Sequence, residues 1–213
     1  MSTAPQERPD PPGASSAPPS VERAAAAARR ARERFGSACG CPVFLRIIRD
    51  EARLELHALS SKGRGSQLAA YPILAQGCPA APKQREGDGL SPEGFYRLSA
   101  ASLHPASKYY LALNIGYPNA YDRRCGRTGS FIMIHGGARS VGCFAVGDAA
   151  IAEIYGAVAA ALQAGQAYVP VQIYPTRMDA PATAADDLRR HLCLGWQYSA
   201  AHGGAPYPDR DND

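Results

Sequence analysis

The order of the apolar runs along the chain constrains its fold more than any other feature. Most runs are short and have the β-branched or alternating residues of strands: residues 43–48, 53–59, 68–75, 108–115, 130–134 and 169–174. One run differs, because its apolar residues keep helical spacing from Asp148, a good helix N-cap, to Gly165. This order predicts a mainly β, α+β fold, either a small β-barrel or a sandwich, with one helix packed on it.

The two ends and one internal loop have other patterns. Residues 1–20 are rich in proline and predict a disordered arm, and residues 21–36 form an Ala/Arg/Glu run that predicts a helix. Residues 77–94, rich in Pro, Gly and charge, predict a long loop. We therefore expect a main domain over residues 41–178, followed at 179–213 by a helical extension that ends in a frayed tail.

Composition narrows the class of protein. Of the 213 residues, 46% are hydrophobic and 20% are charged, which is typical of a globular chain. No run approaches the roughly 20 apolar residues that cross a bilayer, and we find no secretory signal peptide near the start. The net charge of +4 is modest, and aromatic residues do not alternate with Lys and Arg. Nucleic acid is therefore not an expected partner.

The cysteines leave several alternatives open. There are six, at positions 39, 41, 78, 125, 143 and 193, and they lack the paired CxxC spacing of a structural zinc site. A bond between Cys39 and Cys41 would be strained, whereas Cys78 with Cys125 is one pairing that the sequence allows. The number of cysteines is compatible with an oxidising compartment, but the sequence does not determine which cysteines form disulfides.

Residues 131–145 carry the arrangement that most clearly indicates chemistry. A buried strand ends at His135, glycines follow where the backbone turns or a substrate approaches, and a Ser140-x-Gly142-Cys143 turn then presents a thiol. A free thiol has a pKa of roughly 8.5, and a histidine within hydrogen-bond reach can take its proton and stabilise the thiolate as an ion pair. The same imidazolium can then protonate a leaving amine.

The turn before the thiol supplies further candidate groups. The backbone N–H groups of Gly142 and Cys143 could bind a tetrahedral oxyanion, and the Ser140 hydroxyl could bind His135 or the incoming amide. No Asp or Asn is placed to orient His135, so we expect a backbone carbonyl to do so. The alternatives are a buried structural cysteine with a satisfied histidine, or a metal site formed by this pair and another cysteine.

Several motifs match one known family, in order, along residues 43–178. The pattern IHG followed by SxGCxA, at residues 134–145, resembles the catalytic motif of the L,D-transpeptidase catalytic domain (YkuD-type), specifically its YafK-like branch. Residues 87–96 resemble the GDGxTPEGFY loop of that family, with Ser91 where Thr is commoner. Other stretches that fit are residues 107–111, 117–122, 126–129, 165–166 and 173–178.

The resemblance implies a small barrel or sandwich with a helix after the catalytic cysteine, and an enzyme of the cell envelope or periplasm. Cys143 is similar to the family's nucleophile and His135 to its proton acceptor and donor. The implied reaction is acyl transfer on diaminopimelate-containing peptidoglycan stem peptides through a Cys143 thioester, for cross-linking or remodelling of the wall. Neither a cofactor nor a metal is implied.

Two departures from the wider family agree with the YafK-like branch. Val141 stands where the wider family has a second histidine, and Ala145 where it has Arg or Asn. Because that branch includes enzymes that cleave as well as join, a hydrolase that releases wall-attached protein or peptide stays open. A catalytically silent peptidoglycan-binding module is the alternative from another class.

Other residues are candidates to bind the charged ends of a stem peptide: Lys83, Asp88, Tyr121, Asp122, Arg127, Gly136 and Arg139. Arg127 is the best supported, because a planar guanidinium suits a carboxylate and this residue lies in a glycine-rich loop before the catalytic strand. Asp88 and Asp122 are explained equally well as turn caps, and Lys83 as a solvated loop lysine.

Overall fold

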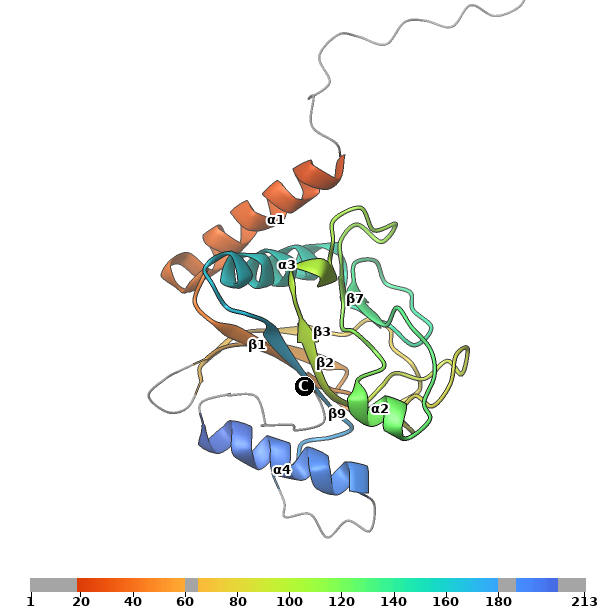
Figure 1. Cartoon of the computed structure of the whole chain (residues 1–213). Coiled ribbons are helices and arrows are strands. Elements are labelled where there is room, and N and C mark those ends of the chain that lie inside the picture. The colour runs from red at the N-terminus through yellow and green to blue at the C-terminus, as the bar shows by residue number, and fades with distance from the viewer. Residues whose placement is uncertain (1–18, 60–64, 180–186, 203–213) are drawn as a thin grey trace, which may run out of the picture.

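A computed structural model describes residues 19–59, 65–179 and 187–202 (Figure 1). Within these ranges the chain forms four α-helices and two sheets, one of five strands and one of four. The predicted α+β class is confirmed, and the strands in the described ranges form two separate sheets instead of a closed barrel. Most of the predicted N-terminal arm and C-terminal tail, residues 1–18 and 203–213, lies outside the described part.

The larger sheet has the strand order β3-β2-β1-β9-β4. Its strands are β1 (Val43–Ile48), β2 (Arg53–Ala58), β3 (Gln67–Pro72), β4 (Gly94–Leu98) and β9 (Val169–Tyr174). β1 and β2 form an antiparallel hairpin, and β9 lies between β1 and β4 as the parallel neighbour of β1. Because side chains alternate along a strand, Leu45 and Ile47 enter the main core while Arg46 and Ile48 face the opposite side.

The smaller sheet carries the candidate site. Its strands, in the order β5-β6-β7-β8, are β5 (Leu103–His104), β6 (Ala112–Asn114), β7 (Met133–His135) and β8 (Phe144–Ala145). β6 and β7 begin later than the predicted strands at 108–115 and 130–134, so the prediction was wrong at both starts. Tyr110 and Phe131 have positive φ angles of 73° and 54°, a backbone conformation that cannot continue a strand.

Helices cover both faces of the larger sheet, with α1 and α3 on one side and α4 on the other (Figure 1). The helices are α1 (Pro19–Phe35), α2 (Ala120–Arg124), α3 (Asp148–Gln163) and α4 (Asp187–Ala201), with 3-10 turns η1 (Gly36–Ala38) and η2 (Ala100–Ser102). α1 packs on α3, and a Cβ on Gly156 would collide with Ala27 and Ala31 of α1. Small residues thus allow the two helices to approach closely.

α4 is attached to the outer face of the larger sheet by apolar and polar contacts. Leu192 and Trp196 belong to an apolar cluster with Tyr174 of β9. Ser199 accepts a hydrogen bond from Arg46 of β1 at 3.3 Å, and the Arg46 guanidinium lies over the Trp196 ring at 4.4 Å. α4 therefore covers part of the outer face of the larger sheet, and the part of that face next to α4 is polar.

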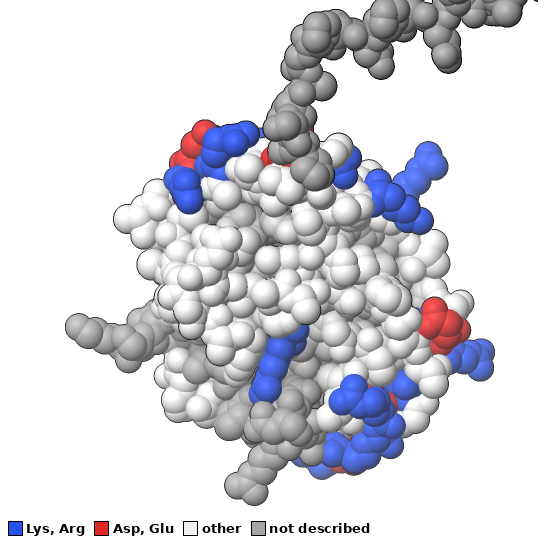
Figure 2. Space-filling model, turned by 45° about the horizontal axis from the view of Figure 1, so that its top comes forward, with Lys and Arg blue, Asp and Glu red and all other residues white. Residues whose placement is uncertain are grey.

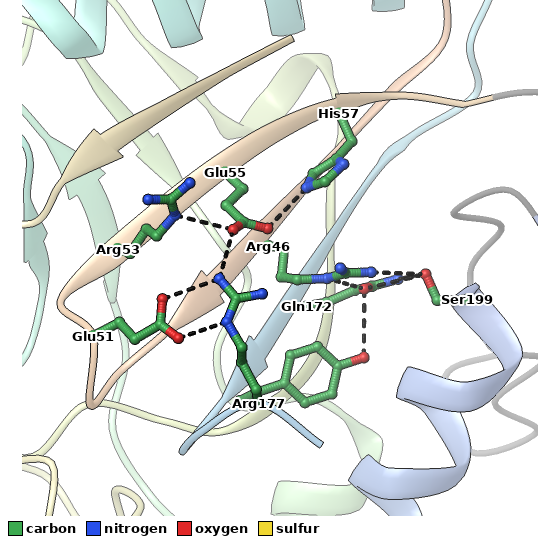
Figure 3. A network of polar contacts seen from close by, with 9 residues as sticks. Arg46, Glu51, Arg53, Glu55, His57, Gln172, Arg177 and Ser199 are labelled. Carbon is green, nitrogen blue, oxygen red and sulfur yellow. Dashed lines mark hydrogen bonds and ion pairs between the residues drawn. The ribbon is translucent and has the colours of Figure 1, made fainter. Parts of the chain in front are cut away.

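The polar part of that face is a network centred on Glu55 of β2 (Figure 3). The Glu55 carboxylate accepts hydrogen bonds from His57 at 2.9 Å, Arg53 at 3.0 Å and Arg177 at 3.2 Å. Burial by itself would raise the pKa of Glu55, but His57, Arg53 and Arg177 together lower it to about 2. Arg177 also pairs with Glu51 through two bonds of 2.6 and 3.0 Å.

The described surface is weakly charged on the face seen in Figure 2. Lys and Arg lie there in separate groups, mostly toward the edge, around a largely uncharged centre. No helix within residues 19–59, 65–179 and 187–202 is long and apolar enough to cross a bilayer.

Candidate active site

Strands β7 and β8 bring the two predicted catalytic residues to neighbouring positions. His135 ends β7 and pairs in parallel register with Ala145 of β8, and Cys143 lies immediately before β8. Continuing that register by one residue pair sets Cys143 beside Met133, two residues before His135. The Met133 N–H donates to the Cys143 sulfur at 3.4 Å, in agreement with that position. Cys143 and His135 therefore occupy nearby positions on one strand pair.

The Cys143 thiol rests between two backbone groups. It donates to the Phe131 carbonyl oxygen at 3.5 Å and accepts from the Met133 N–H at 3.4 Å. Burial raises the pKa of the thiol, and the Met133 N–H, the Lys83 charge and the Ser140 hydroxyl offset only part of that rise. The Ser140 oxygen is buried and makes no well-formed hydrogen bond within the described ranges. The net effect favours the neutral thiol over the thiolate.

The His135 imidazole is oriented by its own backbone and covered by an aromatic ring. Its Nδ1 lies 2.6 Å from the Gly136 carbonyl oxygen. Because a carbonyl only accepts, Nδ1 carries the proton and Nε2 is the basic nitrogen. The Tyr109 ring stacks on the imidazole, with centroids 4.5 Å apart and planes at 28°. Burial lowers the pKa of His135, and the carbonyl hydrogen bond partly opposes this.

Burial thus favours the neutral form of the imidazole, as it does for the thiol. No hydrogen bond joins His135 to Cys143, two residues that both lie in the described range 65–179. The carbonyl that sequence reasoning expected to orient His135 is that of Gly136.

Close packing fixes the turn after His135. A Cβ on Gly136 would collide with the Tyr109 carbonyl oxygen and the Asp148 carboxylate, so packing already accounts for this glycine. Its contact with substrate stays a prediction. Asp148 accepts a hydrogen bond from the Gly137 N–H at 2.8 Å. The prediction of Asp148 as N-cap was wrong, because it is the first residue of α3 and Gly147 is the N-cap.

Lys83 is buried, with 4% of its surface exposed, so its interpretation as a solvated lysine was wrong. Its ammonium donates to the Asp88 carboxylate at 2.8 Å and to the Arg85 carbonyl at 2.9 Å. Asp88 also accepts from the N–H groups of Gln84, Arg85 and Leu90. Burial opposes ionisation of Asp88, but these bonds hold its pKa well below the usual range. Asp88 therefore caps the turn, and the positive charge of Lys83 favours a lower pKa of the Cys143 thiol.

Ser91 joins three segments at the turn before Cys143. Its fully buried hydroxyl donates to the Gly142 carbonyl at 3.0 Å and accepts from the Gly77 N–H at 2.8 Å. Gly142 has a φ of 91°, which favours glycine. A threonine hydroxyl could make the same two bonds, which explains the Ser or Thr at this motif position. Sequence reasoning noted the motif and missed this bracing role.

The other candidate side chains differ in their surroundings. Arg127 donates to the fully buried Asp122 carboxylate at 2.9 Å, and Asp122 caps the start of α2. Tyr121 of α2 stacks on His191 of α4, with ring centroids 5.8 Å apart. Arg139 is exposed in the turn between His135 and the thiol. Arg127 is thus held by an ion pair, and Arg139 lies in the turn between His135 and Cys143.

A cavity of about 350 Å³ is lined by residues 103–109 and Met133. Tyr109 and Met133 also contact His135 and Cys143, respectively. Tyr109 is a site residue that sequence reasoning missed. In the sequence, the only indication of a role for Tyr109 was its position in the family-matching stretch at residues 107–111.

The structure also bears on the cysteine alternatives. No disulfide joins any two of the six cysteines, all of which lie in the described ranges. Among the described residues, no three His, Cys, Asp or Glu side chains come together as a metal ion would require. Cys143 therefore stands as a single thiol close to a histidine.

Comparison with known proteins places the site in a family context. The family model described as L,D-transpeptidase catalytic domain (YkuD) matches residues 53–173. The chain is 46% identical over 140 residues to an Escherichia coli (strain K12) protein named "Putative L,D-transpeptidase YafK", and the same values hold for Escherichia coli O157:H7. That match covers 65% of this chain and 56% of the relative, so the chain spans little more than half of the relative's length.

A solved structure shares the fold. The crystal structure of the helical cell shape determining protein Pgp2 from Campylobacter jejuni superposes with a TM-score of 0.53 at 18% sequence identity. The superposition covers 81% of this chain and 63% of that one.

Proposed function

Because the chain belongs to the L,D-transpeptidase catalytic domain family, we propose that it catalyses acyl transfer on peptidoglycan stem peptides through Cys143. The observation that carries this proposal is the parallel pairing of β7 with β8, which sets a thiol next to a histidine whose Nε2 is free to accept a proton. The cavity beside Met133 and Tyr109 supplies room for the peptide.

In the first step the thiol attacks the amide carbon next to a diaminopimelate centre. The thiol turns from the Phe131 carbonyl toward His135, the S–H proton passes to Nε2, and an S–C bond forms. The Lys83 charge and the Ser140 hydroxyl favour the developing thiolate. The backbone N–H groups of Gly142 and Cys143 are proposed donors to the oxyanion, each worth about 3–4 kcal/mol in related chemistry.

In the second step the C–N bond breaks and the leaving amine takes the proton from Nε2 of His135. This leaves a Cys143 thioester and a neutral imidazole. A second amine can then attack the thioester and give its proton to Nε2. The new C–N bond forms the cross-link, the C–S bond breaks, and the imidazolium returns that proton to the Cys143 sulfur. If water attacks instead, the product is a free carboxylate, which is the hydrolase outcome.

Substrate recognition is proposed to fall to Arg139 in preference to Lys83 and Arg127. Arg139 is exposed in the turn beside the site, whereas the other two cations are held by Asp88 and Asp122. A guanidinium can bind a stem-peptide carboxylate through two parallel bonds. The expected location is the cell envelope, and the expected partners are stem peptides and, in the hydrolase case, a wall-anchored protein.

The test is mass spectrometry of purified muropeptides after incubation with the chain. We expect cross-linked or trimmed products that disappear in Cys143→Ala and persist in Cys125→Ala, a matched change at an exposed cysteine. The product masses identify amine or water as acceptor. If all three samples match, with Cys143 reduced and the protein folded, the catalytic proposal fails and a silent wall-binding module becomes the better account.

A further inference from the structure

Arg23 of α1 is connected to the catalytic histidine by a short chain of contacts. Its Nη1 donates to the carbonyl oxygens of Ser107 at 3.1 Å and Tyr110 at 3.2 Å. Those carbonyls flank Tyr109, whose ring stacks on His135. We propose that Arg23 is a positioning residue for His135, because it holds segment 107–110 so that the Tyr109 ring covers the imidazole.

This inference rests on the proposed function, in which His135 is the base. It goes beyond the family match, because α1 lies outside the matched residues 53–173. Through Arg23, α1 would then help to position the catalytic histidine.

The packing of α1 on α3 holds the backbone of Arg23 in place. Arg23, Ala27 and Ala31 recur every four residues and so share one face of the helix. Ala27 and Ala31 are fully buried against Gly156 of α3, which leaves this face little freedom to move. Arg30 of the same helix pairs instead with Glu153 of α3 at 3.1 Å.

Segment 107–110 forms a turn that needs contacts from outside itself to keep its conformation. Tyr110 has a φ of 73°, an unfavourable backbone conformation for a residue with a side chain. Local bonds support only part of it: the Tyr109 N–H donates to the Ser107 hydroxyl at 3.1 Å, and the Leu111 N–H to the Tyr109 carbonyl at 3.0 Å. Arg23 supplies the two long-range bonds that close the turn.

The Tyr109 ring covers one face of His135, so its position should affect how much water reaches the imidazole. The imidazole is 3% exposed, and Tyr109, which stacks on it, lines the cavity. The titratable groups around it are the Cys143 thiol, the Asp148 carboxylate bound to the following turn, and Lys108, whose ammonium lies 5.1 Å from the Tyr109 ring. Release of the ring would hydrate the imidazole and favour its charged form.

The first test is an NMR titration of His135 in the full chain, with His135→Gln to assign its signal. In Arg23→Ala we expect the pKa of His135 to rise toward about 6.5, the value of an unperturbed histidine. Arg30→Ala is the matched control on the same helix and should leave that pKa at the wild-type value. An unchanged His135 titration in Arg23→Ala would overturn the proposal. Alanine keeps the helix propensity of α1.

The second test measures kcat/KM on muropeptides against pH. We expect Arg23→Ala to lose between about 10- and 100-fold in kcat/KM, as a misplaced catalytic group does. The acid limb of its profile should move to higher pH together with the His135 titration, and Arg23→Lys should recover part of the loss. Because both residues act through one contact, Arg23→Ala combined with Tyr109→Ala should lose no more than Tyr109→Ala alone. If the losses in kcat/KM of the two single variants add fully in the double variant, Arg23 does not act through Tyr109.

The two tests separate this inference from the proposed function. The titration needs no turnover, so a wild type that is inactive on muropeptides but has an Arg23-dependent His135 pKa would reject the reaction and keep the positioning role. An active wild type with Arg23-independent titration and rate would reject the positioning role alone. If Arg23→Ala does not fold, Arg23→Gln replaces it, and its titration decides in the same way.

Discussion

The network around Glu55 and the site around Cys143 use polar side chains in opposite ways. Glu55 accepts from three partners, which lower its pKa to about 2 and keep it charged (Figure 3). Cys143 and His135 each bind backbone groups, and burial shifts the pKa of each toward its neutral form. The Ser140 hydroxyl beside the thiol makes no well-formed hydrogen bond in the described structure.

The difference indicates where stability and reactivity reside. A group whose partners are all present in the folded chain stabilises that fold and has little left to offer a substrate. A group that is held in place in its neutral form can change its protonation state when substrate arrives. Changes at Glu55 should therefore affect unfolding, and changes at the catalytic pair should affect rate.

The largest effect on rate, apart from loss of the thiol, is expected for His135→Gln. Loss of the base should lower kcat/KM by about 10²- to 10⁴-fold, while the free energy of unfolding changes by only about 1 kcal/mol. Muropeptide turnover and urea unfolding measure the two quantities. A folded variant with wild-type turnover would exclude His135 as the base.

The opposite pattern is expected for Glu55→Gln. The change removes the carboxylate that His57, Arg53 and Arg177 share, and breaking a buried ion pair costs about 3–5 kcal/mol. Urea unfolding at neutral pH should show this loss, with kcat/KM unchanged under conditions where the variant is folded. A large fall in kcat/KM without loss of stability would show that Glu55 serves the reaction and not the fold.

Acid should destabilise the wild type through the same carboxylate. The folded-state pKa of Glu55, about 2, lies below its ordinary value of 4.5, so its contribution is fully present above pH 4.5 and is lost as pH falls toward 2. A shift of this size corresponds to about 3 kcal/mol. Unfolding followed from pH 5 to pH 2 should show a smaller decline in Glu55→Gln, and an equal decline would assign the acid sensitivity to other groups.

Ser91→Ala should affect both quantities moderately, because Ser91 braces the turn before the thiol. The change leaves the Gly77 N–H and the Gly142 carbonyl without their buried partner, at a cost of about 1–3 kcal/mol. We expect a lower kcat/KM as well, since the turn positions Cys143. Ser91→Thr, which keeps the hydroxyl, is the control and should preserve stability and rate.

The smallest effect is expected for Glu51→Gln, at the exposed edge of the Glu55 network. Glu51 and Arg177 have side chains 35% and 41% exposed, so water screens their ion pair. The change should cost about 0–1 kcal/mol of unfolding free energy and leave turnover intact. A cost equal to that of Glu55→Gln would mean that burial does not separate the two carboxylates.

The local sequence was sufficient for the family, the α+β class and the main helix near 148–163. Motif order and apolar periodicity lie within short windows, so they can be read without knowing the fold. The same holds for Cys143 and His135, which the motif nominates eight residues apart. Their catalytic roles stay predictions until turnover is measured.

Only the tertiary structure decided the surroundings of those residues. Ser91 meets Gly142 from 51 residues away, and Arg23 meets Ser107 from 84 residues away. No local pattern records such contacts, because they arise when separate strands and helices pack. The same packing buries Lys83 and sets the positive φ of Tyr110, which local propensity would not predict. The sequence therefore determined which groups are available, and packing decided their partners, their charge state and their exposure to water.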